Sequence, residues 1–412
     1  MAVPSPANAR ARARPKPLAA PVSSATFGGH RRGPVSPLFF MQFCEQIRCH
    51  VRVPSRHVIA LLFDEIWQRK ALILMNAKCN LITGASGLLG SHIAQQLVER
   101  GEQVVALVRP TSDIGFLQGL GVEIRVCDLR NPASLQQAFT GAGIVYHCAA
   151  KVGDWGPWPE FQAQTIDATK HVVHACQATG VDRLLYVSAI SVYGIIKDRS
   201  RPVTETDPLG QHLPWWDYYA RAKIQAEEQA RRFERCTVIR PPWFFGSRDR
   251  ATIARVVQAL RGHRVRLIGR GDNSLSILHA ADVARGAILA ANHAEAEGQI
   301  YNLCCEQGIT QKELLDVVTE YLSLAPITRH VPYFLANRLA FAGECLARLW
   351  RRTKPPALTR RAVYLIGRSA LFSSAKARSQ LQWAPQADIR EGIREALKWY
   401  LESEVAAQRR AG

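Results

Sequence analysis

A glycine-rich turn between residues 83 and 90 limits the fold of this chain more than any other feature. A short apolar run at residues 81–82 leads into Thr83, and Gly84, Gly87 and Gly90 then follow at spacings of three. Apolar residues after the turn recur at helical spacing. A strand, a glycine turn and a helix N-terminus form a phosphate cradle, because the backbone can approach closely and the helix N–H groups favour negative charge. We therefore expect dinucleotide binding here, although glycines at this spacing also suit a plain tight turn.

Strand and helix patterns alternate from Met75 onward, which predicts a doubly wound parallel α/β sheet. We expect a Rossmann domain at residues 75–245 and a smaller C-terminal α/β lobe for substrate at residues 246–405, interleaved with it. Residues 1–74 are rich in Arg, Pro, Ala and Ser, and their first acidic residue is Glu45. Such a composition is typical of a disordered leader or targeting segment. We favour a translation start at Met75 over targeting.

The net charge of +19 raises the question of an anionic partner. No nucleic-acid-binding motif accompanies the charge, so we expect anionic cofactors or membrane surfaces and no nucleic acid. The ten cysteines show no C-x-x-C spacing, and we expect neither a metal site nor a disulfide framework. No run of eighteen apolar residues is present. We expect a cytoplasmic protein, with peripheral membrane binding and a homodimer left open.

The Thr83-Gly84-x-x-Gly87-x-x-Gly90 spacing resembles the extended short-chain dehydrogenase/reductase superfamily, in its NAD-dependent epimerase/dehydratase branch. The resemblance extends over about residues 78–400. The Gly-Asp-Trp-Gly-Pro phrase at residues 153–157 is more similar to 3β-hydroxysteroid dehydrogenase-like and 2-alkyl-3-oxoalkanoate reductase-like proteins than to sugar epimerases. The resemblance implies a Rossmann fold and hydride transfer with a nicotinamide cofactor.

Arg109 ends the second expected strand, where an NAD-preferring site would carry an acid that binds the adenine ribose. A guanidinium can instead pair with a 2′-phosphate, so we favour NADP(H) over NAD(H), unless Arg109 only points to solvent. Thr165 stands where the family has an Asn. The resemblance implies these cofactor-binding residues: Thr83, Gly84, Ser86, Gly87, Leu88, Gly90, Arg109, Asp128, Leu129, Ala149, Ala150, Lys151, Thr165, Tyr219, Lys223 and Pro242.

Tyr219 and Lys223 are the expected catalytic pair. They are four residues apart in a helical pattern and therefore share one helix face. An ammonium group near a phenol lowers the phenol's pKa. Tyr219 would donate a proton to a ketone oxygen, or take one from an alcohol, while hydride moves. The family resemblance implies that Lys223 also binds the nicotinamide ribose; the alternative is a solvated helix face.

The third catalytic position of the family, a Ser or Thr, is Ala189 in this chain. Ser191 lies two residues further along the expected strand and would share its face, whereas Ser188 would need a bulge. We name both as catalytic candidates. Loss of one such donor typically costs ~10²–10³ in kcat, so the enzyme could be weakened. A retired dinucleotide-binding protein is the alternative from another class.

Aromatic side chains follow two of the expected strands, and they suit a bulky apolar substrate. These substrate-binding candidates are Trp155, Trp158, Trp243 and Phe244. For Trp155 and Trp158, the alternative is that they cap the core. We expect an NAD(P)-dependent oxidoreductase that interconverts a hydroxyl and a ketone on a sterol-like or 3-oxoacyl substrate. A sugar-nucleotide epimerase or dehydratase is the alternative enzyme.

Residues 331–354 combine apolar residues with five Lys or Arg residues. This pattern predicts a basic amphipathic helix. Such a helix either lies on an anionic membrane surface or packs as a lid over the substrate.

Overall fold

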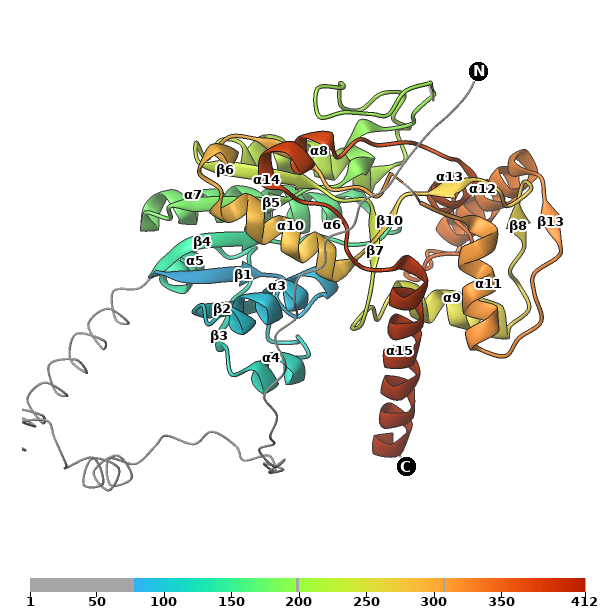
Figure 1. Cartoon of the computed structure of the whole chain (residues 1–412), viewed down its shortest axis with the longest axis horizontal. Coiled ribbons are helices and arrows are strands. Elements are labelled where there is room, and N and C mark those ends of the chain that lie inside the picture. Colours follow the sequence, from blue (N-terminus) through green and yellow to red (C-terminus); the bar gives the residue numbers. More distant parts are fainter. Residues whose placement is uncertain (1–77, 198–199, 307, 412) are drawn as a thin grey trace, which may run out of the picture. The chain divides into compact units, whose positions relative to one another are not determined.

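Seven parallel strands form the central sheet, in the order β11-β6-β5-β4-β1-β2-β3 (Figure 1). The computed structural model describes residues 78–197, 200–306 and 308–411, so the leader predicted at 1–74 lies outside the described residues. The strand order reverses between β1 and β4, which is where doubly wound sheets bind ligands. The predicted fold class is confirmed. The strands are β1 (Cys79–Thr83), β2 (Val104–Val108), β3 (Glu123–Val126), β4 (Ala142–His147), β5 (Arg183–Val187), β6 (Cys236–Arg240) and β11 (Ile300–Asn302).

Helices cover both faces of the sheet, because successive strand residues point to opposite faces and both faces are apolar. Leu81 packs into one core and its neighbour Ile82 into the other. The core around Ile82 is covered by α3 (Leu88–Glu99), α4 (Gly115–Leu120), α10 (Ala280–Asn292) and α14 (Ala375–Leu381). The core around Leu81 is covered by α5 (Pro132–Phe139), α7 (Ala168–Thr179) and α8 (Tyr218–Ala230).

The C-terminal lobe has its own apolar core, formed by residues such as Phe245, Val257 and Leu397. It is not one continuous stretch, because α10, β11 and α14 belong to the sheet's layers. The elements outside the central sheet and its layers are β7 (Trp243–Phe245), α9 (Thr252–Arg261), β8 (Leu267–Ile268), β9 (Ser274–Leu275), β10 (Ile277–His279), β12 (Ile309–Thr310), α11 (Gln311–Tyr321), β13 (His330–Val331), α12 (Tyr333–Leu349), α13 (Arg360–Gly367) and α15 (Ile389–Ala411).

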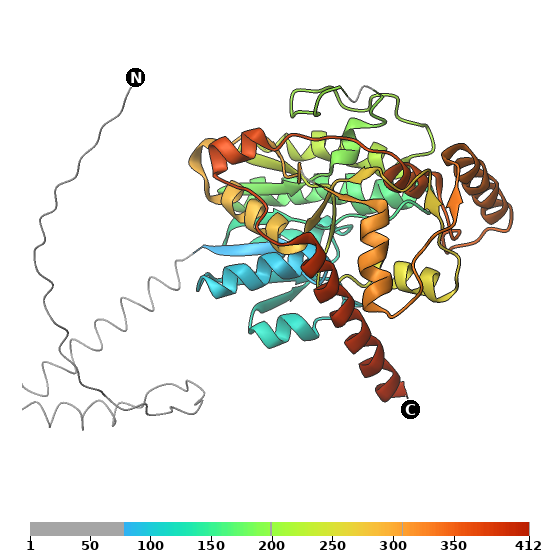
Figure 2. The same cartoon turned by 45° about the vertical axis from the view of Figure 1, so that its right-hand side comes forward.

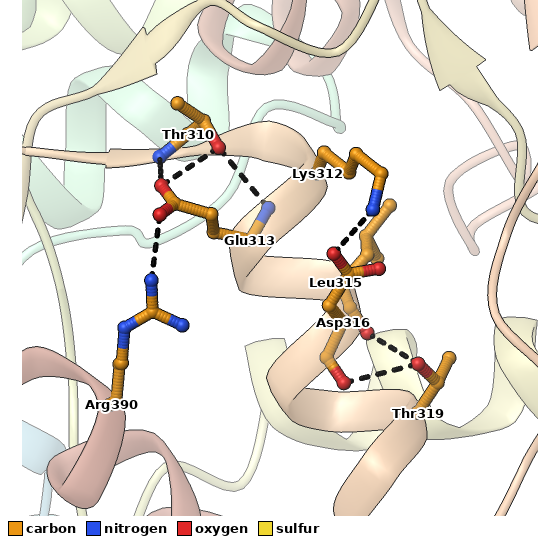
Figure 3. Close-up of polar contacts among 7 residues, drawn as sticks. All are labelled: Thr310, Lys312, Glu313, Leu315, Asp316, Thr319 and Arg390. Atoms are coloured by element: carbon orange, nitrogen blue, oxygen red, sulfur yellow. Dashed lines mark hydrogen bonds and ion pairs between the residues drawn. The ribbon is translucent and has the colours of Figure 1, made fainter.

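A capping box fixes the start of α11 (Figure 3). The Thr310 hydroxyl accepts a hydrogen bond from the Glu313 backbone N–H at 3.1 Å, and the Glu313 carboxylate accepts one from the Thr310 N–H at 2.9 Å. The two bonds satisfy two helix-end donors that would otherwise lack partners. Arg390, near the start of α15, also binds this carboxylate at 2.6 Å, so the cap joins α11 to α15.

Short helical segments interrupt the expected pattern at two places. A short helix α6 (Trp158–Phe161) and a π-helical turn η1 (Gln162–Asp167) precede α7, and a 3₁₀ turn η2 (Ile190–Tyr193) follows β5. The strand expected over residues 183–194 therefore ends at Val187. The helix expected over 331–354 is also shorter, since it ends at Leu349. Within the described part of the chain, no helix has the length and apolar character needed to cross a membrane.

Candidate functional site

The glycine turn after β1 is built for close backbone approach. Gly84 has φ +68°, a conformation that side chains other than glycine rarely adopt, and a Cβ there would lie 2.9 Å from the Ala149 nitrogen. A Cβ on Gly90 would collide with the Gly84 carbonyl oxygen. Gly87 stands at the N-cap of α3, so the helix presents its free N–H groups at this turn. These features fit the pyrophosphate of a dinucleotide.

Most of the predicted cofactor-binding residues lie at or after the carboxyl ends of parallel strands, which meet at one edge of the sheet. Thr83 ends β1 and the residues up to Gly90 follow it, Arg109 follows β2, Asp128 and Leu129 follow β3, Ala149 to Lys151 follow β4, and Pro242 follows β6. The others lie on helical segments, Thr165 in η1 and Tyr219 and Lys223 on α8.

Buried side chains join the ends of β1 and β4 to α7 and η1. His147 binds the hydroxyl of Thr83 through Nδ1 at 2.7 Å and that of Thr169 through Nε2 at 3.0 Å. Burial lowers the pKa of His147 to about 3, so the ring is neutral and structural. Thr165 accepts a hydrogen bond from the Lys151 backbone N–H at 3.0 Å. The Thr that replaces the family's Asn therefore fixes the loop after β4.

Lys223 reaches from α8 to the end of β5. Its Nζ donates to the Val187 carbonyl oxygen at 2.7 Å and lies 5.2 Å from the centre of the Tyr186 ring. The side chain is buried, and this burial lowers its pKa to about 8. Tyr219, one helical turn earlier, is half-buried, and its partial burial raises the pKa of its phenol. The expectation that Lys223 lowers the Tyr219 pKa is wrong for this structure, since the cation that lowers it is Arg361.

Arg361, on α13 of the C-terminal lobe, places its guanidinium carbon 4.7 Å from the centre of the Tyr219 ring. Its Nη1 donates to Asp217 Oδ2 at 2.5 Å, and Asp217 Oδ1 caps α8 by accepting from the Ala220 N–H at 3.1 Å. The Asp217 carboxylate opposes Arg361 and raises the Tyr219 pKa. Arg361 is not recognisable from the sequence, because no local spacing ties it to α8; its place near the start of a basic helix is the one local signal.

The hydroxyl of Ser188 is committed to a buried ion pair. It donates to Glu227 Oε2 at 2.5 Å, and the same oxygen accepts from Arg240 Nε at 3.1 Å. Arg240 also donates to the Tyr193 hydroxyl at 2.8 Å. Glu227 and Arg240 are almost completely buried. Ser188 thus has a structural partner, which argues against the catalytic role we assigned to it.

Ser191 is the more suitable catalytic candidate. Its hydroxyl oxygen is buried and has no hydrogen-bond partner among the described residues. The strand argument that selected it is wrong, because β5 ends at Val187 and Ser191 lies in the 3₁₀ turn η2. The chain leaves the sheet here, so alternation of side chains between two faces no longer applies.

Two of the four aromatic candidates lie between β4 and η1, Trp155 in the loop and Trp158 at the start of α6. Trp155 donates from Nε1 to the Arg352 carbonyl oxygen at 3.1 Å, and it therefore contacts the segment just after α12. Trp158 packs 5.6 Å from the ring of Tyr218 on α8.

The other two aromatic candidates pack against apolar cores. Trp243 packs against the lobe core and Phe244 against the core around Ile82. This placement gives both side chains a packing role beside their predicted one.

The predicted adenosine end of the site is more exposed than the region around Lys223. Asp128 pairs with Arg130 at 2.6 Å, and this hydrogen bond is the main cause of a lowered Asp128 pKa. Arg109 is exposed and adds to the same lowering. In the residues that the structure describes, no group of three or more His, Cys, Asp or Glu side chains is arranged to hold a metal ion.

Comparisons with known proteins agree with this geometry. A model of the NAD dependent epimerase/dehydratase family matches residues 80–304. The chain is 27% identical over 345 residues to the 2-alkyl-3-oxoalkanoate reductase of Shewanella oneidensis, covering 79% of this chain and 88% of the relative. It is 28% identical over 335 residues to the sterol-4-alpha-carboxylate 3-dehydrogenase, decarboxylating, of Mus musculus, covering 77% and 89%.

Among solved structures, MoeE5 in complex with UDP-glucose and NAD superposes with a TM-score of 0.61 at 25% sequence identity. The match covers 79% of this chain and 99% of that chain.

Proposed function

The chain belongs to the NAD-dependent epimerase/dehydratase family, and we propose that it is an NADP(H)-preferring oxidoreductase acting on bulky apolar 3-hydroxy or 3-oxo acids. It is an enzyme of a family that includes named reductases and dehydrogenases. The observation that carries the proposal is a guanidinium, that of Arg361, placed 4.7 Å from the ring centre of Tyr219.

We infer the substrate class from that guanidinium together with the substrates that the two relatives' names give. A 2-alkyl-3-oxoalkanoate and a sterol-4-alpha-carboxylate oxidised at C3 share one feature: the reacting carbon is β to a carboxylate. A guanidinium beside the proton donor would bind this carboxylate while the reacting carbon faces Tyr219. Arg361 donates to Asp217 through Nη1 only, and its other N–H groups have no acceptor among the described residues.

Each site residue then has a definite task. When bound, the nicotinamide supplies or accepts the hydride. Tyr219 donates a proton from its hydroxyl to the ketone oxygen, or removes one from the alcohol. Lys223 holds the ribose with the ammonium that now binds the Val187 carbonyl, and Ser191 supplies the hydroxyl that Ala189 lacks. Half-buried Tyr219 keeps its proton at neutral pH, since desolvation raises its pKa, and a protonated phenol is the form needed for ketone reduction.

The cofactor preference rests on charge. Exposed Arg109 at the end of β2 would pair with a 2′-phosphate, and no acid ends that strand to bind a free 2′-hydroxyl. We expect kcat/KM for NADPH to exceed that for NADH. An Arg109→Ala variant should lose this preference while its turnover with NADH stays unchanged.

The test is oxidation of a 2-alkyl-3-hydroxyalkanoate with NADP⁺, followed through NADPH absorbance, with its methyl ester and UDP-glucose as comparison substrates. We expect the acid to exceed the ester by about tenfold in kcat/KM, which is the scale of one charge-assisted hydrogen bond. An Arg361→Leu variant should treat acid and ester alike. Conversion of UDP-glucose alone to its C4 epimer, detected by chromatography because epimerisation leaves no net NADPH, would overturn the proposal in favour of an epimerase.

The same assay also compares the wild type with a variant at position 189. If the missing hydroxyl weakens this enzyme, an Ala189→Ser variant should raise kcat on the hydroxy acid. If neither protein turns over any of the substrates while both still bind NADPH, the chain is a retired dinucleotide-binding protein, and the proposal fails.

A further inference from the structure

Helix α12 carries an unusual concentration of exposed apolar side chains. Its buried side is made of small residues and one acid, namely Ala336, Ala340, Ala347 and Glu344. Seven of the fourteen large apolar side chains exposed in the described part of the chain lie on this helix or at its C-cap. They are Phe334, Leu335, Leu339, Phe341, Leu346, Leu349 and Trp350, with exposed fractions from 40% to 76%. Exposed apolar patches of this kind mark interaction surfaces.

The same segment is strongly cationic. Residues 332–354 contain five Lys or Arg residues, all exposed: Arg338, Arg348, Arg351, Arg352 and Lys354. The single acid of the segment, Glu344, is buried and binds Arg360 of α13 through both carboxylate oxygens. The outer surface of residues 332–354 therefore presents cations and apolar groups and no carboxylate.

We propose that this surface of α12 docks on a lipid bilayer that carries anionic headgroups. Apolar side chains beside long cationic ones are what an interfacial helix needs, because the apolar groups enter the acyl boundary while the cations reach the headgroups. Each cation near an anionic leaflet adds to the attraction. Figure 2 shows α12 at the outer edge of the described part, on the side away from β1 to β3.

A second copy of the chain fits this surface less well. A two-fold dimer would place the same patch against itself, which would bring five cations of one protomer against five of the other. Like charges juxtaposed at an interface cost several kcal/mol. The homodimer that the sequence left open would therefore use another surface.

The docking surface is joined to the candidate site through α13. Arg360 binds Glu344 of α12, and the next residue, Arg361, lies over Tyr219. Trp155 of the loop after β4 binds the backbone of Arg352, just beyond α12. If the proposed function is correct, an apolar substrate dissolved in the bilayer would lie close to the site; the docking itself does not depend on that function.

The test measures binding of the full chain to sonicated vesicles by sedimentation. We expect binding to vesicles of equal parts phosphatidylglycerol and phosphatidylcholine, and weak binding to pure phosphatidylcholine. A quadruple Leu335→Gln/Leu339→Gln/Leu346→Gln/Leu349→Gln variant should lose at least about tenfold in affinity, because four exposed leucines no longer leave water. A triple Arg351→Gln/Arg352→Gln/Lys354→Gln variant should lose the preference for phosphatidylglycerol.

The matched control is Val126→Gln, which changes an equally exposed apolar residue on β3 and should bind like the wild type. Circular dichroism and the unfolding midpoint check that each variant is folded. Unchanged binding of the folded leucine variant would overturn the proposal and assign adsorption to charge elsewhere on the chain. Failure of the wild type to bind, with a dimer in light scattering that the leucine variant abolishes, would assign the surface to a second copy.

Discussion

Tyr219 and Lys223 lie in a region where burial, rather than their mutual attraction, dominates their proton affinities. Burial raises the pKa of the phenol and lowers that of the ammonium to about 8. The sequence correctly pairs them on one helix face, because a four-residue spacing fixes that geometry. It does not reveal Arg361, whose contact with the phenol depends on how the C-terminal lobe packs against α8.

Removing the guanidinium of Arg361 should move the pH dependence of alcohol oxidation. The phenolate of Tyr219 is needed for that direction, and loss of the cation, with Asp217 left unpaired, raises its pKa. In an Arg361→Leu variant, the midpoint of kcat against pH should move to higher pH. Arg361→Lys, which keeps the charge, should move it less; an equal midpoint in all three proteins would contradict the assignment.

The lowered pKa of Lys223 predicts a pH-dependent difference in stability between the wild type and a Lys223→Met variant. Between its folded value of about 8 and its ordinary value of 10.5, the unfolded chain binds the proton and the folded chain does not. Wild-type stability relative to the variant should therefore rise with pH. We expect a gain of about 2 kcal/mol between pH 8 and pH 10 in urea unfolding without cofactor. A constant difference would mean that buried Lys223 is not desolvated as described.

At the scale of elements, α8 is held to the sheet by the buried pair of Glu227 and Arg240, to which Ser188 also binds. Glu227 continues the face that carries Tyr219 and Lys223, each four residues apart. The sequence carries two signals of this pair. Glu227 is a charged residue on the buried side of a helix, and Arg240 is a charged residue at the end of an apolar strand. The sequence alone does not pair these two residues, because a buried charge is recognisable only once its partner is placed.

Breaking this pair should destabilise the fold strongly. An Arg240→Met variant leaves the Glu227 carboxylate buried without a counter-charge, and we expect a loss of about 3–5 kcal/mol in the free energy of unfolding. Ser188→Ala removes one hydrogen bond and should cost about 1 kcal/mol. Urea denaturation of both variants checks the order. A loss below 1 kcal/mol for Arg240→Met would show that the pair contributes little.

At the scale of the whole molecule, the sequence predicted the doubly wound sheet, the glycine turn and the family, because these depend on local patterns that repeat along the chain. The predicted resemblance to the epimerase/dehydratase branch is confirmed. The ends of β5 and α12 were misplaced, since short turns such as η2 have no periodic signal. Residues 246–405 are divided between the C-terminal lobe and the helices and strand that belong to the central sheet. This division depends on long-range packing, which residue spacing does not encode.

The proposed reaction depends above all on proton transfer by Tyr219, coupled to the movement of hydride. The most direct test compares wild type with Tyr219→Phe in NADPH affinity, from nucleotide fluorescence, and in kcat for the acid substrate. We expect unchanged NADPH affinity and a loss of about 10²–10⁴-fold in kcat, which is the usual contribution of a general acid or base. A variant that binds NADPH and turns over within about twofold of the wild type would contradict the claim.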